Sequence, residues 1–263
     1  MHYPHVATGD IHVLPSSEAA PGHGVLPVNA YLIRDRAPVL VDTGLPSDRD
    51  EFLEQLWSLV APEDLRWVFL THEDRDHAGN LLPVLETATG CRLVTNYVTL
   101  SKLLEAWSLP LDRVVVVNPG QHFSTAEREL LVLRPPLYDA PGTIGLWDPV
   151  TAAAFTVDAF GTYLPELAED LSDLAEAEAR AGFADFNRVN HPWATMVDQG
   201  RFAHALDGLR RLRPSLLLSS HGVLARGQTD RLIDAMATIP DLDPFVPPDQ
   251  ARFEALRPEM GGG

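Results

Sequence analysis

The sequence has a single cysteine, Cys91, among 263 residues. One cysteine cannot form an intrachain disulfide or supply the several thiolates of a structural zinc or iron–sulfur site. No apolar run approaches the roughly 20 residues that a membrane-spanning helix needs, and the first ten residues, MHYPHVATGD, lack the basic and apolar parts of a secretion signal. We therefore expect a cytoplasmic protein in which any metal is held by histidine, aspartate and glutamate.

Positive charge is also scarce, because 20 Lys and Arg face 37 Asp and Glu, which gives a formal net charge of −17 and a pI near 4.8. This charge repels nucleic acid and anionic membrane surfaces, so we expect neither as a partner. Bound cations could neutralise part of the excess acid. Hydrophobic residues make up 45% of the chain, enough for a sizeable core in one large domain or two small ones.

Short apolar segments rich in β-branched residues alternate with amphipathic segments in the first hundred residues. This alternation between periods of 2 and 3.6 residues predicts strands separated by helices. The expected order is strands at 29–35 and 37–44, a helix at 47–60 capped by Ser47, a strand at 66–72, a helix at 80–90, a strand at 91–96 and a helix near 98–107.

The later part of the chain has apolar segments with few helices between them, which favours antiparallel pairing. Two mixed halves with helices outside predict an α/β fold, a four-layered αββα sandwich over residues 1–238, followed by a Pro-rich peripheral tail at 239–263. The expected elements are strands at 112–118, 129–136, 143–149 and 152–161, an acidic helix at 164–182, an amphipathic helix at 201–213 and a strand at 214–222.

Polar residues able to do chemistry follow five of the expected strands. They are Asp42, the stretch from His72 to His77, Asp139, Asp158 and His221. In layered α/β folds the loops beyond strand ends hold binding groups, because the strands fix them while the loops leave them accessible. We expect these five segments to converge on one place.

The densest of these segments, THEDRDH at 71–77, offers metal ligands at positions 72, 74, 76 and 77. A turn can direct alternate residues to one side, so His72 and Asp74 could serve one cation while Asp76 and His77 serve a second. A single ion takes four to six donors and could not easily use all the candidates, whereas two ions sharing a carboxylate could. The alternative is a helix N-terminus with solvated acids, which suits a single acid better than the whole set.

The motifs resemble, in order and spacing, those of metallo-β-lactamase-fold proteins, and they extend over residues 29–222. The segments are VLVDTG (39–44), THEDRDHAGN (71–80), APGTIGL (140–146), VDAFG (157–161) and SSHG (219–222). Hydrolases of that superfamily usually show H-x-H-x-D-H, whereas Asp74 occupies the position of their second histidine. An acid there is more similar to the diiron domain of flavodiiron proteins and to stand-alone oxygen-binding diiron proteins, whose motif is H-x-E-x-D-H.

The resemblance implies a pair of metal ions. Asp139 stands where the family has a histidine before a P-G turn, so it is expected as a ligand; alternatively it caps the turn, or the site holds one metal. The implied ligands are His72 and Asp74 for one metal, Asp76, His77 and His221 for the other, Asp158 as the bridge, and Asp139.

Four carboxylates and three imidazoles would carry a charge of 4−, which balances two divalent cations. Hard anionic oxygens favour higher oxidation states, so the set suits iron that reacts with dioxygen better than zinc that polarises water. Two iron ions are therefore the expected cofactor, and manganese, zinc or a mixed pair fits the same ligands.

Tyr138 and His191 are candidate catalytic residues. Tyr138, beside the Asp139 turn, could donate a hydrogen bond to bound oxygen or could pack in the core. His191, with Trp193 and Met196 in NHPWATM, could line the mouth of the pocket or belong to a packed loop.

Three residues beside the candidate ligands are expected to support them or to face solvent. Asp42, in the DTG motif, is expected to orient the metal-binding loop through hydrogen bonds. Glu73 and Arg75 alternate away from the ligand side, towards solvent or behind the ligands.

The predicted function is that of a binuclear non-haem diiron oxidoreductase that binds and reduces or activates dioxygen, with a small molecule as a second substrate. The alternatives are an oxygen sensor without turnover and a metal-dependent hydrolase of a small ester, thioester or phosphoester. A flavodiiron reductase of the usual kind needs a flavodoxin-like domain of about 150 residues. We expect a separate electron-donor protein, the substrate or the ferrous pair to supply electrons, and a homodimer is compatible with the sequence.

Overall fold

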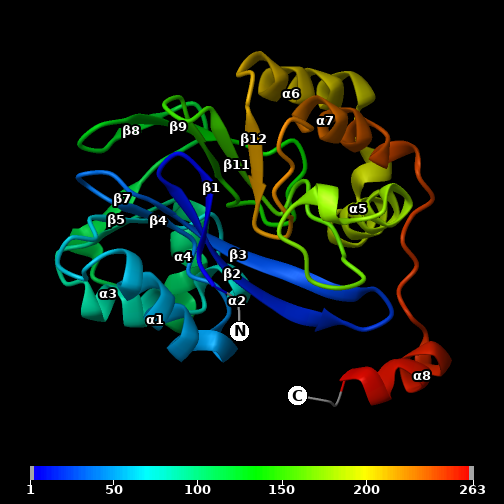
Figure 1. Ribbon diagram of the computed structural model, residues 1–263, viewed down its shortest axis with the longest axis horizontal. Helices are drawn as coiled ribbons and strands as arrows, with labels where there is room; N and C mark the ends of the chain where they lie inside the picture. Colours follow the sequence, from blue (N-terminus) through cyan, green and yellow to red (C-terminus); the bar gives the residue numbers. More distant parts are fainter. Residues whose placement is uncertain (1–2, 261–263) are drawn as a thin grey trace.

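The computed structural model describes residues 3–260, and its first β-sheet has its strands in chain order (Figure 1). The first four strands pair antiparallel and the last four pair parallel. The strands are β1 (His5–Thr8), β2 (Ile11–Ala20), β3 (Gly24–Ile33), β4 (Val39–Val41), β5 (Trp67–Phe69), β6 (Arg92–Thr95) and β7 (Val114–Val116). The helices between them are η1 (Pro46–Asp48), α1 (Arg49–Leu59), α2 (Arg75–Ala78), α3 (Leu81–Thr87), α4 (Tyr97–Ala106) and η2 (Leu111–Arg113).

The second sheet has the strand order β12-β11-β10-β9-β8. Its strands pair antiparallel except for the parallel pair of β11 and β12. The strands are β8 (His122–Ser124), β9 (Glu129–Leu133), β10 (Gly145–Asp148), β11 (Ala153–Val157) and β12 (Leu216–Ser219). The helices are η3 (Leu171–Asp173), α5 (Glu176–Asn190), η4 (Ala194–Met196), α6 (Gln199–Arg211), α7 (Thr229–Ala237), η5 (Ile239–Asp241) and α8 (Gln250–Met260).

The two sheets face each other, and helices cover their outer faces (Figure 1). Side chains alternate along each strand, so Phe69 of β5 packs between the sheets while its neighbour Val68 packs under α1 and α3. A separate core under α5, α6 and α7 covers the second sheet, with Phe202, Leu206 and Leu209 of α6 buried in it. The predicted αββα sandwich is confirmed.

Two local expectations are wrong. The helix expected at 164–182 is the later helix α5, because the residues before it are held extended. Leu164 exchanges backbone hydrogen bonds with Val25 at 2.8 and 2.9 Å, and the Leu171 N–H donates to the Leu224 carbonyl at 2.7 Å. Ser47 does not cap α1, since it lies inside η1 and the helix begins only after Asp48.

The N-terminal hairpin and several short elements were not expected. β1 and β2 add two antiparallel strands to the first sheet, the first half of β3 lengthens the strand expected at 29–35, and β8, α7 and α8 are further additions. After η5 the chain runs extended to α8, which lies apart from the helical layers (Figure 1). There Leu256 approaches Gly22 in the turn between β2 and β3.

The carboxyl ends of β4, β5, β11 and β12 lie at the same edge of the sandwich. Each sheet contributes a parallel pair, and residues that follow the strands of one sheet contact those that follow the strands of the other, as in the pairs His77–Asp158 and Asp76–His221. Three non-glycine residues at this edge have left-handed backbone, Asp42 (φ 60°), Val157 (φ 60°) and Phe160 (φ 70°). A β-branched residue rarely adopts this conformation, so the strain at Val157 is held by the surrounding structure. It turns the chain sharply just before Asp158.

Among residues 3–260, no helix combines the length and apolar character needed to cross a bilayer.

Candidate metal centre

The turn after β5 is fixed from behind by Asp42. Its Oδ1 accepts from the Thr71 N–H at 2.9 Å, and its Oδ2 accepts from the Thr71 hydroxyl at 2.9 Å. The same Oδ2 lies 2.8 Å from Nδ1 of His77. These contacts match the expected role of Asp42, and they hold the segment from His72 to His77 rigid at the strand end.

The first group of candidate ligands consists of His72, Asp74 and Asp139. Nε2 of His72 lies 3.8 Å from Asp74 Oδ2 and 3.9 Å from Asp139 Oδ1, and all three donor atoms lie within 4.8 Å of one another. The side chain of Asp74 is 51% exposed and that of Asp139 is 24% exposed. This group therefore opens to solvent.

The second group consists of Asp76, His77 and His221. The first two follow β5 of the first sheet, and His221 follows β12 of the second sheet. Oδ2 of Asp76 lies 3.5 Å from His77 Nε2 and 3.2 Å from His221 Nε2. The imidazoles are nearly completely buried, with side-chain exposures of 1% and 5%. This group also has three donors within 4.8 Å, but it lies deeper than the first.

Asp158 lies between the two groups. Its Oδ2 is 3.6 Å from His72 Nε2, whereas its Oδ1 is 3.1 Å from His77 Nε2 and 3.4 Å from His221 Nε2. Each carboxylate oxygen thus faces a different group. This is the arrangement that a bridging ligand requires.

Buried polar atoms at the centre lack aligned hydrogen-bond partners, which supports metal binding. Nε2 of His72, Nε2 of His77 and Oδ1 of Asp158 are inaccessible to solvent and make no hydrogen bond of acceptable geometry. Buried polar atoms are normally paired. These donor atoms lie close together without hydrogen-bonding to one another, as the donors around a metal ion do. The residues therefore fit a metal pair.

The opposite nitrogen of each imidazole has a partner. His221 Nδ1 lies 2.9 Å from the Pro27 carbonyl, which can only accept, so this nitrogen carries the proton. His77 Nδ1 faces Asp42, and His72 Nδ1 lies 3.1 Å from the Thr71 hydroxyl. Such contacts fix the tautomer and leave Nε2 with a lone pair towards a metal.

The environment of the centre raises the pKa values of two of its histidines and of Asp139. Burial opposes protonation, but Asp158 and Asp76 together raise the pKa of His221 to about 10. Burial likewise opposes it at His77, but Asp42, Asp76 and Asp158 raise the pKa well above its usual value. For Asp139, burial and the neighbouring Asp158 raise the pKa to about 7. Protons therefore compensate the carboxylates wherever a cation does not.

His191 lies fully buried at the C-terminal end of α5. Its Nδ1 is 3.2 Å from the Asn187 carbonyl, and its Nε2 is a further buried atom without a partner. Burial lowers the pKa of His191 to about 4, although Asp158 partly opposes the shift. His191 is therefore a neutral imidazole near the centre, and its catalytic role stays a prediction.

The neighbouring Asn190 was missed by the sequence reasoning. Its Nδ2 donates to Asp158 Oδ2 at 3.4 Å. The position next to His191 was the only available signal. Asn190 supplies the candidate bridge with a hydrogen bond from α5.

Tyr138 packs in an aromatic cluster beside the centre. The Arg134 guanidinium lies 4.8 Å from its ring centroid, and the Trp193 ring lies 5.8 Å away. Trp193 also meets the His191 ring edge-on at 5.9 Å, whereas Met196 is 79% exposed. Tyr138 is therefore half-buried against neighbouring side chains and not within a core cluster, and its donation to bound oxygen stays a prediction.

Glu73 points away from the ligands, as expected. It accepts a hydrogen bond from Thr99 of α4 at 3.1 Å and pairs with Lys102. Arg75 is exposed at the start of α2. Neither side chain belongs to the two candidate ligand groups.

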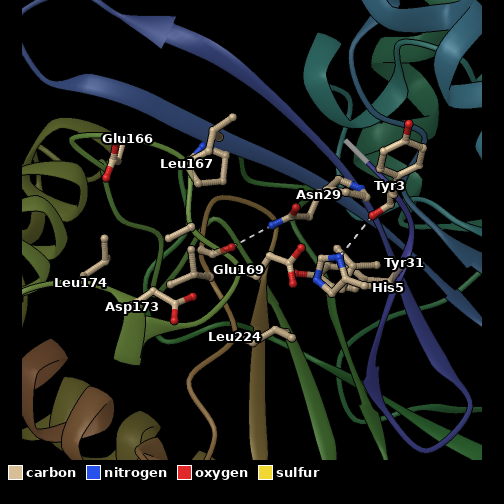
Figure 2. Close-up of a pocket in the computed structure, with 16 residues that line it drawn as sticks. Tyr3, His5, Asn29, Tyr31, Glu166, Leu167, Glu169, Asp173, Leu174 and Leu224 are labelled. Atoms are coloured by element: carbon tan, nitrogen blue, oxygen red, sulfur yellow. Dashed lines mark hydrogen bonds between the residues drawn. The ribbon is translucent and has the colours of Figure 1, made fainter. Parts of the chain in front are cut away.

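A cavity of about 520 Å³ lies beside the centre, next to the residue that follows His221 (Figure 2). Tyr3, His5 and Asn29 line one side of it and Glu166 lies on the other, with Glu169 between them. The residues that line it include none of the seven candidate ligands. The cavity is therefore separate from the candidate metal centre.

Comparison with known proteins assigns the chain to a family. Residues 23–221 match the metallo-beta-lactamase superfamily. Three curated relatives are 23–34% identical over 78–80% of this chain, which spans 35–52% of their lengths. One of them is a nitric oxide reductase from Moorella thermoacetica, 24% identical over 215 residues, or 80% of this chain and 52% of that protein.

Two solved structures share the fold with a TM-score of 0.80. One is the rubredoxin oxygen:oxidoreductase of Desulfovibrio gigas, 18% identical, with 92% of this chain and 62% of that chain covered. The other is the flavodiiron protein of Giardia intestinalis, 16% identical, with 91% and 60% covered. At these identities the likeness concerns the fold.

Proposed function

The chain belongs to the metallo-β-lactamase superfamily, and we propose that within it the chain is a binuclear iron protein that reduces dioxygen. The observation that carries the proposal is the position of Asp158, one oxygen towards His72 and the other towards His77 and His221. A mononuclear site would need only one of these groups. Two groups joined by a carboxylate suit two ions.

The donor set supports iron over zinc. Carboxylates supply four of the seven candidate ligands, and two of them, Asp74 and Asp139, stand in the more exposed group. Hard oxygen donors stabilise the ferric state, which an iron centre that reduces oxygen must reach. The similar proteins include a flavodiiron protein, an oxygen:oxidoreductase and a nitric oxide reductase. Nitric oxide is therefore the competing substrate.

The protein's own residues would orient and enclose the reaction. When bound, the iron pair would supply electrons to a diatomic substrate, and the open side at Asp74 and Asp139 gives access to it. His77 and His221 are held from behind by Asp42 and the Pro27 carbonyl, so the donors need little reorganisation. Neutral, buried His191 would accept a hydrogen bond through Nε2.

We further propose that residues 1–238 form the metal-binding unit and that electrons come from a separate donor protein. The name of the Desulfovibrio gigas relative refers to rubredoxin, which supports a protein donor. Ile239 of η5 is buried with the helical core, so packing continues a few residues past this boundary. A small organic substrate is the other candidate electron source.

The test is anaerobic loading with ferrous iron, followed by elemental analysis and mixing with limiting dioxygen or nitric oxide. We expect about two iron ions per chain and faster oxidation by dioxygen. Faster consumption of nitric oxide would assign the other substrate. Recovery of one zinc ion with hydrolysis of a thioester or phosphoester would refute the proposal and assign a hydrolase.

A further inference from the structure

Helix α5 packs directly on the loops that carry two of the candidate ligands, Asp158 and His221. Gly161 allows this close approach, because a Cβ atom there would overlap the ring of Phe186 in α5 and lie 2.8 Å from Cβ of His221. Asn187, also in α5, is fully buried, and its Nδ2 donates to the Gly161 carbonyl at 3.0 Å. The Gly161 N–H in turn donates to the Asp158 carbonyl at 3.0 Å. The last turn of α5 is therefore fixed relative to Asp158.

Asn190, at the C-terminal end of the same helix, contacts one side of the candidate bridge. Its Nδ2 donates to Asp158 Oδ2 at 3.4 Å, and this oxygen lies 3.6 Å from His72 Nε2. The other oxygen, Oδ1, lies 3.1 Å from His77 Nε2 and makes no hydrogen bond of acceptable geometry. The contact from α5 is therefore directed at the oxygen that faces the first group of candidate ligands.

The orientation of the Asp158 carboxylate decides how it can serve two metals. A carboxylate can bind two ions with one oxygen each, or it can turn and bind a single ion with both oxygens. A hydrogen bond to one of the oxygens opposes this rotation, in the way that partners behind a metal ligand fix its orientation. Because α5 is anchored through Gly161, the amide of Asn190 offers such a fixed partner.

We infer that Asn190 is a positioning residue for the bridging carboxylate. It holds Asp158 Oδ2 towards the ion of the first group, so this ion depends on Asn190 and the ion of the second group does not. No motif of the sequence indicates this residue, since it comes from the end of a helix and not from the end of a strand. The inference rests on the proposed binuclear centre and adds a residue outside its ligands that controls one of its two ions.

The experiment compares Asn190→Leu with the parent protein by anaerobic titration of chelator-treated protein with Fe²⁺ against a competing chelator. Leucine is similar in size to asparagine and has a higher helix propensity, so α5 is not weakened. Removing a partner behind a ligand typically weakens metal binding by about 10- to 100-fold. Because the contact is long, we expect a loss of about tenfold for one ion and no change for the other. Both affinities are measured without turnover.

Three further variants test whether the effect comes from the amide and acts on the first group. Arg188→Leu is the control in the same turn, because Arg188 contacts Asp185 at 3.1 Å and the Asp243 carbonyl at 3.3 Å, and it should leave both affinities unchanged. Asn190→Gln keeps an amide donor and should bind both ions as the parent does. In the background of Asp74→Ala, which disables the first group, Asn190→Leu should not change the affinity of the remaining ion.

The possible results separate this inference from the proposed function. Two unchanged affinities in Asn190→Leu, or equal losses for both ions, would overturn the positioning role and leave the binuclear centre standing. A loss in Asn190→Gln as large as in Asn190→Leu would also overturn it. A single metal site in the parent protein would refute the binuclear centre and the inference with it. Circular dichroism checks the folding of each variant, and Asn190→Ala takes the place of Asn190→Leu if that variant does not fold.

Discussion

Two places in the molecule bury carboxylates, and they lie at opposite ends of the sandwich. Asp35 precedes β4 and Asp42 follows it, and the antiparallel strands β10 and β11 carry Asp148 and Asp158 at opposite ends. Around Arg128, three aspartates meet a guanidinium: Nη1 lies 2.6 Å from Asp148, Nε lies 3.4 Å from Asp35, and Nη2 pairs with Asp10. At the metal centre, the carboxylates pair only with histidines among the ion pairs of the described chain.

The difference lies in the source of the positive charge. Arg128 is always protonated and its side chain is 3% exposed, so its cluster is complete without a ligand. The metal centre has imidazoles, which bind either a proton or a metal. In the absence of a cation, protons accumulate there, because burial opposes protonation of His221 but its carboxylate neighbours outweigh burial and raise its pKa to about 10. A buried acidic cluster with its own arginine is structural, whereas one with histidines can bind metal.

Removing Asp158 should have the largest effect on metal binding. Asp158→Ala deletes a donor from both groups and leaves two cations without a shared anion between them. We expect both metals to be lost together, measured by elemental analysis after iron loading. Asp158→Asn is the matched variant, since it keeps shape and removes charge. Loss of a single equivalent would show that Asp158 serves one ion only.

Removing Arg128 should destabilise the fold without affecting the metals. Arg128→Met leaves two fully buried aspartates, Asp35 and Asp148, without their cation, and breaking a buried pair costs about 3–5 kcal/mol. Chemical denaturation of metal-free protein measures this free energy. Arg36→Met is the control, because the pair of Arg36 with Glu127 is exposed and should contribute under about 1 kcal/mol. A large loss of metal in Arg128→Met would contradict the division between the two clusters.

The metal-ligand cluster could be predicted from the sequence, whereas no pattern in the sequence indicated the cluster around Arg128. The candidate ligands could be found because the motif THEDRDH is local and because Asp158 and His221 closely follow strands β11 and β12, whereas Asp139 lies within the loop between β9 and β10. Arg128 and its partners come from separate turns, so no short pattern connects them. Asn190 was missed for a similar reason, since it lies at the end of a helix that the sequence placed too early.

The fold could be predicted where hydrophobic periodicity was clear. The parallel strands β4 to β7 follow their apolar runs, whereas Pro15 and Pro27 interrupt the long strands β2 and β3 and hide them. The segment from residue 164 has a helical pattern, but its backbone bonds to Val25 and Leu224 override it. Tertiary pairing of this kind is not visible in local sequence.

A smaller effect is expected from the support behind the ligands. Asp42→Asn keeps an oxygen for the Thr71 N–H but loses the acceptor for His77 Nδ1. Removing such a partner typically weakens metal binding by about 10- to 100-fold. Competition with a chelator measures the affinity. Asp35→Asn, before the same strand, is the control and should lower stability while leaving metal affinity unchanged.

The smallest effect should be a difference in pH dependence between the two metal positions. Burial and Asp158 raise the pKa of Asp139 to about 7, above its unfolded value of 3.8, so protonated Asp139 stabilises the metal-free fold fully below 3.8, and this contribution is lost as the pH rises through 7. A metal at the open position, formed by His72, Asp74 and Asp139, must displace that proton below pH 7, which weakens binding by about tenfold per pH unit there.

At the buried position, formed by Asp76, His77 and His221, the competing proton is on His221, whose pKa of about 10 means that affinity should keep rising up to that pH. Mn²⁺ serves as a probe of the open position, because its binding can be followed by electron paramagnetic resonance. Between pH 5.5 and 8, on protein holding one iron, its binding should level off above pH 7. Asp139→Asn should bind Mn²⁺ more weakly but without this pH dependence, because its amide does not titrate. A plateau at the same pH in both proteins would show that another group controls the open position.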